Sequence, residues 1–247
     1  MSQVVAVIPA RFGAQRFPGK ALAPILGKPM IHWVVEGVSQ SKLIKKIIVA
    51  TDDQRISDVC QKLNVKVVMT SPELASGSDR VYEAIKNEPE ELILNIQGDE
   101  PLIQGSLVDQ MAQAMIEESE WEMFTLAESL DDQDLDNPSV AKILLNQRQE
   151  AIYFSRFPIP YSRGKKQPKE RAAALKHIGL YGYKKDFLRM FCQTPPVTME
   201  KMEGLEQLRA LYLGGRIKVL RVDYESRGVD TPEDVEKVEK NLRARNG

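Results

Sequence analysis

The segment that most constrains the fold lies near the start of the chain. Val4 to Ile8 is an apolar, β-branched run without polar alternation, which is typical of a strand buried on both faces of a sheet. Three cations then follow within ten residues: Arg11, Arg16 and Lys20. Gly13 and Gly19 allow a ligand to approach the backbone closely. The segment predicts a phosphate-binding loop after a parallel strand, and a solvated strand-to-helix connection is the alternative.

Similar apolar runs recur through the first half of the chain, separated by segments with helical spacing. They predict three further buried strands: Lys46–Ala50, Val65–Met69 and Leu92–Ile96. The second half is less regular, with helices expected over 106–119, 203–213 and 232–243 and strands over 123–126, 140–145, 177–183 and 217–222. We predict an α/β fold, a mixed and mostly parallel sheet with helices on both faces, in a single domain over 1–247.

The composition excludes several classes of partner. The chain has 247 residues and a formal net charge of −1, so no global field favours nucleic acid or an anionic membrane. The two cysteines, Cys60 and Cys192, lack metal-ligand or redox spacing, and no apolar stretch reaches the length of a membrane span. Cys60 falls on the apolar face of a predicted helix and is expected in the core. These features predict a soluble, cytoplasmic protein with reduced thiols.

Two acidic segments could hold a divalent cation. Asp99 lies in the turn Gly98-Asp99-Glu100-Pro101, at the sheet edge expected to carry the Arg11 loop, and its hard oxygens suit Mg²⁺. A simple strand-ending turn is the alternative. In the second segment, Thr231 or Asp230 can cap a helix whose first position is Pro232. If Thr231 supplies the cap, the Asp230 carboxylate remains available for a metal.

The cationic loop resembles a known signature. Pro9-Ala10-Arg11 followed by Arg16-Phe17-Pro18-Gly19-Lys20 is similar to the loop of sugar nucleotidyltransferases, most closely the CMP-sugar-acid synthetases. The resemblance implies a Rossmann-like, glycosyltransferase-A-type nucleotidyltransferase fold. It also implies that Ala10, Arg11 and Lys20 bind the nucleotide, that Arg11, Arg16, Lys20 and Asp99 are catalytic, and that Asp99 and Asp230 bind Mg²⁺.

Ser76-Gly77-Ser78-Asp79-Arg80 opens a predicted helix with a cation nearby. The segment resembles the part of these enzymes that contacts the cytosine, which implies nucleotide-binding roles for Ser76, Gly77 and Arg80. For Arg80, an ion pair on the surface is the alternative.

Three later segments resemble the acceptor side of the 3-deoxy-manno-octulosonate cytidylyltransferase family: Phe154–Arg156, His177–Tyr183 and Glu203–Arg209. A carboxylated, polyhydroxylated sugar needs a cation and several hydrogen-bonding side chains. The resemblance assigns sugar binding to five residues: Gln97, Arg156, His177, Tyr181 and Glu206. Taken singly, His177 and Tyr181 also fit core packing, and Glu206 fits a solvated helix face.

The resemblance implies an enzyme that activates 3-deoxy-D-manno-octulosonate (KDO) with CTP for lipopolysaccharide biosynthesis. A cytidylyltransferase for an 8-amino-octulosonate or a sialic acid is one alternative, and a non-catalytic nucleotide-binding regulator is another. The resemblance also implies a homodimer, with residues 151–196 as a dimerisation and acceptor-side region. The apolar and aromatic residues of this region are Phe154, Phe157, Ile159 and Tyr161.

Overall fold

The structure, a computed structural model, describes residues 3–13, 17–161, 163, 173–224 and 228–246. The predicted catalytic residue Arg16 therefore lies outside the described residues. The chain divides into two compact units, Met1–Glu117 with Ser226–Gly247 and Glu118–Glu225. The first unit is thus built from two separate stretches of sequence. The predicted region 151–196 falls within the second unit.

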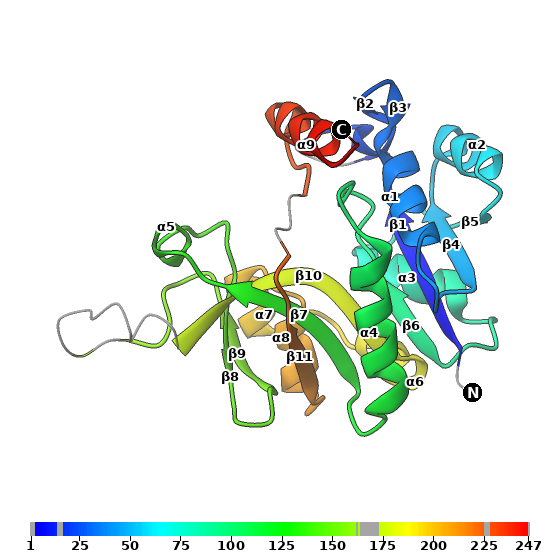
Figure 1. The fold of residues 1–247 in the computed structure, drawn as a ribbon. Helices are drawn as coiled ribbons and strands as arrows, with labels where there is room; N and C mark the ends of the chain where they lie inside the picture. Colours follow the sequence, from blue (N-terminus) through cyan, green and yellow to red (C-terminus); the bar gives the residue numbers. More distant parts are fainter. Residues whose placement is uncertain (1–2, 14–16, 162, 164–172, 225–227, 247) are drawn as a thin grey trace. The chain divides into compact units, whose positions relative to one another are not determined.

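The first unit contains a four-stranded parallel arrangement in the order β6-β1-β4-β5 (Figure 1). Its strands are β1 (Val4–Ala10), β4 (Lys46–Thr51), β5 (Lys66–Met69) and β6 (Leu92–Asn95). β1 is central, and Val5, Ala6, Val7 and Ile8 are fully buried. The four strands predicted from the apolar runs are confirmed, with boundaries that differ by at most two residues.

Helices cover both faces of this parallel arrangement. They are α1 (Met30–Ser39), α2 (Gln54–Lys62), α3 (Gly77–Ile85) and α4 (Gly105–Glu117). Because parallel crossovers are right-handed, α1 and α2 share one face, and the reversed direction from β5 to β6 places α3 on the other. The reversal creates a switch point between β1 and β6, whose carboxyl ends are the usual place for a ligand in such sheets. Arg11 follows β1 there, and Gln97 to Asp99 follow β6.

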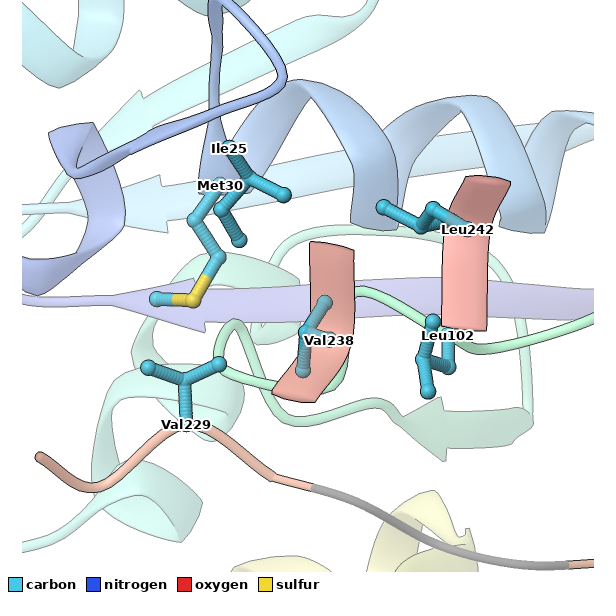
Figure 2. Packing of buried hydrophobic residues seen from close by; sticks show 6 residues of the cluster. All are labelled: Ile25, Met30, Leu102, Val229, Val238 and Leu242. Carbon is cyan, nitrogen blue, oxygen red and sulfur yellow. The ribbon is translucent and has the colours of Figure 1, made fainter. Parts of the chain in front are cut away.

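The second stretch of the first unit ends in α9 (Pro232–Asn246), which contacts the hairpin of β2 (Pro24–Ile25) and β3 (Lys28–Pro29). A short 3₁₀ helix, η1 (Lys20–Leu22), precedes this hairpin. Figure 2 shows the cluster between them, formed by Ile25, Met30, Leu102, Val229, Val238 and Leu242. Polar contacts reinforce it, since the N–H of Leu26 donates to the Glu239 carboxylate at 2.9 Å. The cluster fixes the segment that carries Asp230.

The second unit has a mixed sheet. β7 (Met123–Ser129) lies between β10 (Ala174–Lys184), which is antiparallel to it, and β11 (Ile217–Arg221), which is parallel. β8 (Lys142–Leu145) pairs with β10 and with β9 (Ala151–Ser155), both antiparallel. β9 was not expected, because its side chains do not form one of the apolar runs used to predict strands. The sheet register shifts between Ile178 and Tyr181 of β10.

The described part of the second unit also contains four short α-helices: α5 (Asp132–Leu135), α6 (Lys185–Gln193), α7 (Thr198–Glu203) and α8 (Gln207–Tyr212). The prediction of one helix over 203–213 is wrong. Gly204 ends α7 in the left-handed region, with φ 63°, which glycine adopts without a steric penalty. A new helix then begins at Gln207, so Glu206 stands at a helix start.

Among the described residues, no helix combines the length and the apolar character that a bilayer crossing requires. Cys60 is fully buried in α2, as expected, and burial raises the pKa of its thiol to about 12. Cys60 and Cys192 form no disulfide.

Candidate functional site

The loop after β1 folds back on itself. The N–H of Gly19 donates to the carbonyl of Phe12 at 2.8 Å, and Gly19 has a φ of 71°. A Cβ at Gly19 would lie 2.9 Å from the Phe12 ring, so both the conformation and the contact require glycine. Arg11 is exposed immediately after β1, while Lys20 opens η1 on the returning side. The loop thus places both cations beside the switch point.

The turn after β6 approaches the end of β1 closely. A Cβ at Gly98 would lie 2.7 Å from the Pro9 carbonyl oxygen and 3.4 Å from the Cβ of Ala10. Only glycine fits at this distance without a backbone shift. The predicted nucleotide residue Ala10 is 4% exposed, and Asp99 follows Gly98 directly. Close packing at Gly98 therefore places the Asp99 carboxylate beside the cationic loop.

Lys20 joins the two acidic segments. Its Nζ donates to Asp99 Oδ2 and, at 3.3 Å, to the Val229 carbonyl, and lies 3.6 Å from Asp230 Oδ1. The N–H of Val229 also donates to the Asp99 carbonyl at 2.9 Å. Asp99 and Asp230, 131 positions apart in sequence, therefore meet around one ammonium group. This arrangement reduces the repulsion between the two carboxylates.

The start of α9 shows how Asp230 comes to face Lys20. Asp234, not Asp230, supplies the carboxylate of the cap and accepts the N–H groups of Thr231 at 3.1 Å and Asp230 at 3.2 Å. The Thr231 hydroxyl also donates to Asp234 at 3.1 Å. In these contacts the cap uses the side chains of Thr231, one of the two residues predicted to cap the helix, and Asp234, while the Asp230 carboxylate lies 3.6 Å from Lys20 Nζ.

The donor set around Lys20 suits a hard cation. Asp99, Asp230 and the Val229 carbonyl present oxygen atoms only, and Mg²⁺ is commonly bound through one or two carboxylates together with substrate phosphates. In the described part of the chain, no group of three or more His, Cys, Asp or Glu side chains is arranged to hold a metal. A divalent cation here would therefore take most of its ligands from a phosphate chain and water.

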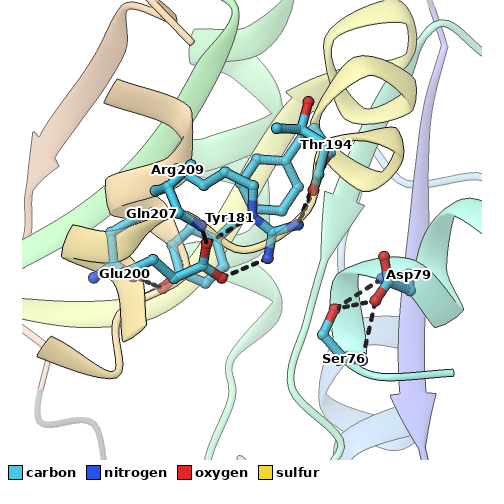
Figure 3. A network of polar contacts seen from close by, with 9 residues as sticks. Ser76, Asp79, Tyr181, Thr194, Glu200, Gln207 and Arg209 are labelled. Atoms are coloured by element: carbon cyan, nitrogen blue, oxygen red, sulfur yellow. Dashed lines mark hydrogen bonds and ion pairs between the residues drawn. The ribbon is translucent and has the colours of Figure 1, made fainter. Parts of the chain in front are cut away.

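The start of α3 lies against the same edge of the parallel strands. Ser76 and Asp79 form a reciprocal capping box (Figure 3), with the Asp79 N–H donating to Ser76 Oγ at 3.1 Å. A Cβ at Gly77 would lie 3.6 Å from Pro9 and 3.9 Å from Gln97 Oε1. Gln97, predicted to bind the sugar, thus lies in the first unit near the residues predicted to bind the nucleotide.

Arg80 is not a surface side chain. It is 2% exposed, and its guanidinium donates to Thr70 Oγ1 and, at 3.0 Å, to Asp52 Oδ2. The ion-pair alternative therefore describes this structure in part, although the pair is buried rather than exposed. Base reading by Arg80 stays a prediction.

In the second unit, His177 is held as a neutral ring. Its Nε2 lies 2.9 Å from Thr125 Oγ1, and the Thr125 hydroxyl lies 2.9 Å from the Leu180 carbonyl. Because that hydroxyl has one proton to donate to a carbonyl, Nε2 of His177 must be the donor toward Thr125. Burial lowers the pKa of His177 to about 3. Nδ1 is then an acceptor at neutral pH.

This low pKa predicts a pH dependence of stability. An unfolded histidine, with a pKa of 6.5, gains a proton before the folded one does as the pH falls. The His177 contribution is therefore complete above about pH 6.5 and is lost toward pH 3, with a slope of at most about 1.4 kcal/mol per pH unit. Denaturant unfolding from pH 4.5 to 7 checks this against His177→Asn, whose stability should fall less steeply with acid. Parallel curves would contradict it.

Tyr181 lies beside His177, with 5.5 Å between the ring centroids. Burial, with the Glu206 carboxylate nearby, raises the pKa of Tyr181 above its ordinary value, and Arg156 partly opposes this. The Tyr181 hydroxyl donates to Gln207 Oε1 at 3.3 Å (Figure 3). The structure therefore brings His177, Tyr181 and Glu206 together, with a Tyr181 hydroxyl that stays protonated. Their binding of the sugar stays a prediction.

Arg156 is largely occupied by backbone carbonyls. Nε donates to Glu203 O at 2.8 Å, Nη1 to Pro138 O at 3.0 Å and Ser139 O at 3.3 Å, and Nη2 to Gly204 O at 3.4 Å. The guanidinium links the loop before β8 to the end of α7 while keeping its positive charge. Its predicted contact with a sugar carboxylate stays a prediction.

Two residues without a role predicted from the sequence contact predicted site residues: Gln207 contacts Tyr181, and Asp52 contacts Arg80. Gln207 is 2% exposed, and its Nε2 has no hydrogen-bond partner among the described residues. Asp52 contacts both Arg80 and the backbone of the Arg11 loop. The sequence did contain a sign that Asp52 has another role. Two consecutive aspartates, Asp52 and Asp53, follow β4, and the cap of α2 needs only one of them. No comparable signal marked Gln207.

The chain is similar to proteins named as cytidylyltransferases. The cytidylyltransferase family model matches residues 5–218. The 3-deoxy-manno-octulosonate cytidylyltransferase of Bdellovibrio bacteriovorus is 49% identical, covering 97% of this chain and 98% of its own length. The 8-amino-3,8-dideoxy-manno-octulosonate cytidylyltransferase of Shewanella frigidimarina is 43% identical, covering 97% and 98%.

A solved structure of a CMP:2-keto-3-deoxy-manno-octonic acid synthetase in complex with CTP is similar to the whole chain. The TM-score is 0.92 at 39% identity, covering 99% of this chain and 100% of that one. This similarity confirms the predicted nucleotidyltransferase fold. The solved protein binds CTP.

Proposed function

The chain belongs to the cytidylyltransferase family, and we propose that it activates 3-deoxy-D-manno-octulosonate with CTP, giving CMP-KDO and pyrophosphate. The observation that carries the proposal is the meeting of Lys20, Asp99 and Asp230 at the switch point. A protein that only sensed nucleotide would not need metal ligands, whereas here two carboxylates from distant segments of the chain meet at Lys20. The product would serve lipopolysaccharide biosynthesis, and two cysteines without a disulfide fit a cytoplasmic enzyme.

In this reaction the anomeric hydroxyl oxygen of the sugar attacks the α-phosphorus of CTP. The bond from that phosphorus to the bridging oxygen of the β-phosphate breaks, pyrophosphate leaves, and the hydroxyl proton passes to water. Arg11 and Lys20 lie at the switch point, where their charges would stabilise the triphosphate and the charge that develops on it. Arg16 shares this proposed role. No covalent bond to the protein is needed.

We propose Mg²⁺ as the cofactor, with Asp99 and Asp230 as its protein ligands. When bound, it would neutralise phosphate charge and lower the pKa of the attacking hydroxyl. The protein groups would orient this site: Lys20 contacts both carboxylates, and Val229 fixes the backbone of Asp99. Two carboxylates would leave phosphate oxygens and water to supply the remaining ligands.

The acceptor residues supply complementary groups for a sugar acid. His177 Nδ1 and the Glu206 carboxylate would accept from sugar hydroxyls, and so would the oxygen of the Tyr181 hydroxyl, whose proton is donated to Gln207. Arg156 adds a positive charge for the sugar carboxylate. These groups match a polyhydroxylated, carboxylated ligand better than an apolar one. Gln97, in the first unit, keeps its predicted sugar-binding role as a separate proposal.

The test is pyrophosphate release from CTP and Mg²⁺ when the sugar is added. We expect release with KDO, little with UTP or ATP, and less with 8-amino-3,8-dideoxy-manno-octulosonate or a sialic acid. Higher kcat/KM with the 8-amino sugar would move the assignment to the activity named for the Shewanella relative. Binding of CTP without release from any of these sugars would favour the regulator.

We also propose a homodimer. Two of the residues predicted for this region are exposed, Phe157 at 74% and Tyr161 at 88%, and Ile152 and Met190 add exposed apolar side chains among its described residues. Such side chains are enriched at interfaces. Of the other two residues predicted for this region, Phe154 is fully buried and Ile159 is half-buried. Light scattering at micromolar concentration should give about twice 27.9 kDa, and Phe157→Ser with Tyr161→Ser should lower it. A monomer mass for the unmodified protein would contradict the proposal.

A further inference from the structure

Phe12 anchors the loop that carries Arg11. Its N–H donates to Asp52 Oδ1 at 3.1 Å, and its carbonyl accepts from Gly19. The guanidinium of Arg55 lies 3.7 Å from the centroid of the Phe12 ring. The backbone of Phe12 is therefore fixed at both its N–H and its carbonyl, and one of those contacts comes from the turn after β4.

The second oxygen of Asp52 reaches a different element. Oδ2 accepts from Arg80 Nη2 at 3.0 Å, and the side chains of Asp52 and Arg80 are 12% and 2% exposed. Arg80 belongs to α3, the helix whose start lies against Pro9 and Gln97. One carboxylate thus connects the loop after β1 to α3.

Capping of α2 does not explain Asp52. Asp53 performs that task, since its Oδ1 accepts the N–H of Arg55 at 2.9 Å. The two contacts of Asp52 instead join segments that lie at the two ends of a bound nucleotide in the proposed function. A buried, charge-assisted contact of this kind is strong and specific in direction.

We propose that Asp52 is a positioning residue that couples the grip on the phosphates to the reading of the base. By restraining Phe12 and Arg80 through one carboxylate, it makes displacement of either segment disturb the other. The proposal rests on the proposed function for the identity of the ligand. It places Asp52 outside direct contact with substrate.

The first test is Asp52→Asn, which keeps the shape of the side chain. An amide presents one oxygen, so it cannot accept from both Phe12 and Arg80 and also loses the charge toward Arg80. Asp58→Asn is the matched control, because Asp58 is exposed on α2 and accepts only from Gln54 in the contacts described. Calorimetry measures pyrophosphate affinity, and steady-state kinetics measures the ratio of kcat/KM for CTP over UTP.

For Asp52→Asn we expect pyrophosphate affinity and the CTP-over-UTP ratio each to fall about tenfold, the size of one charge-assisted hydrogen bond. Asp58→Asn should change neither by more than about twofold. A loss in only one of the two quantities, or in neither, would overturn the coupling. If the unmodified protein binds pyrophosphate but forms no pyrophosphate from CTP with any sugar, the proposed function is wrong.

Arg80→Lys tests the link from its other end and guards against misfolding of Asp52→Asn. A single ammonium cannot contact Thr70 and Asp52 in the way the guanidinium does. If the link operates, pyrophosphate affinity falls several-fold even though Arg80 is proposed to read the base. Unchanged pyrophosphate affinity in a folded Arg80→Lys protein, shown by an unshifted circular dichroism spectrum, would overturn the proposal.

Discussion

Asp99→Asn is expected to lower turnover by about 100-fold or more, in line with the several kcal/mol that a catalytic metal contributes. The amide removes a charged oxygen ligand and preserves the side-chain shape beside Lys20. Raising Mg²⁺ should recover part of the loss if metal binding alone is weakened. Initial rates over a Mg²⁺ series measure both effects, and thermal unfolding is expected to change little because the side chain is 27% exposed.

Asp230→Asn distinguishes a metal ligand from a purely structural residue, because Asp230 also stands at the start of α9. The cap depends on the Asp234 carboxylate and the backbone N–H groups of Thr231 and Asp230, which the amide does not change. A similar loss of turnover is therefore expected without loss of helix stability. If Asp230→Asn keeps near-normal activity and Mg²⁺ dependence, Asp230 is only part of a helix start.

Lys20→Met is expected to lower turnover by about 100-fold or more and to make folding sensitive to Mg²⁺. The ammonium group contacts both carboxylates, so its loss leaves Asp99 and Asp230 to repel each other. Mg²⁺ should then raise the thermal midpoint of the variant more than that of the unmodified protein. Scanning calorimetry with and without Mg²⁺ measures this difference without any substrate.

Lys28→Met is the matched control for this change. Lys28 also pairs with a carboxylate, that of Glu36 at 3.3 Å, but it lies outside the proposed site. Its removal should leave turnover and the Mg²⁺ response of the midpoint near those of the unmodified protein. Equal Mg²⁺ responses in Lys20→Met and in the unmodified protein would contradict the shared-carboxylate arrangement.

The strands of the first unit could be predicted because a strand that is buried on both faces has an uninterrupted run of apolar residues. β9 could not be predicted in this way, because the exposure of its side chains follows no regular pattern. Ile152 is exposed and Phe154 is buried, although they are two positions apart and would lie on one face of a regular strand. The break between α7 and α8 depends on one left-handed residue, Gly204. Helical spacing on either side of a glycine does not reveal that conformation.

The site was predictable at its charged residues and less so at their partners. Arg11, Lys20 and Asp99 stand next to strand ends, and strand order brings those ends together. The burial of Arg80 and its pairing with Asp52 depend on how α3 packs against the parallel strands, which no local pattern encodes. The same holds for Arg156, whose carbonyl partners come from Pro138, Ser139 and a turn near Glu203.

The first unit is interrupted in sequence by the whole of the second, and this sets an order of events during translation. β1, β4, β5 and β6 leave the ribosome early, whereas Val229, Asp230 and α9 follow only after Glu118–Glu225 has been made. Until then Ile25, Met30 and Leu102 lack their partners from α9, and nascent chains expose apolar surface open to chaperones or aggregation. The proposed Mg²⁺ site likewise cannot form during this period, because half of its carboxylate pair, Asp230, has not yet been made.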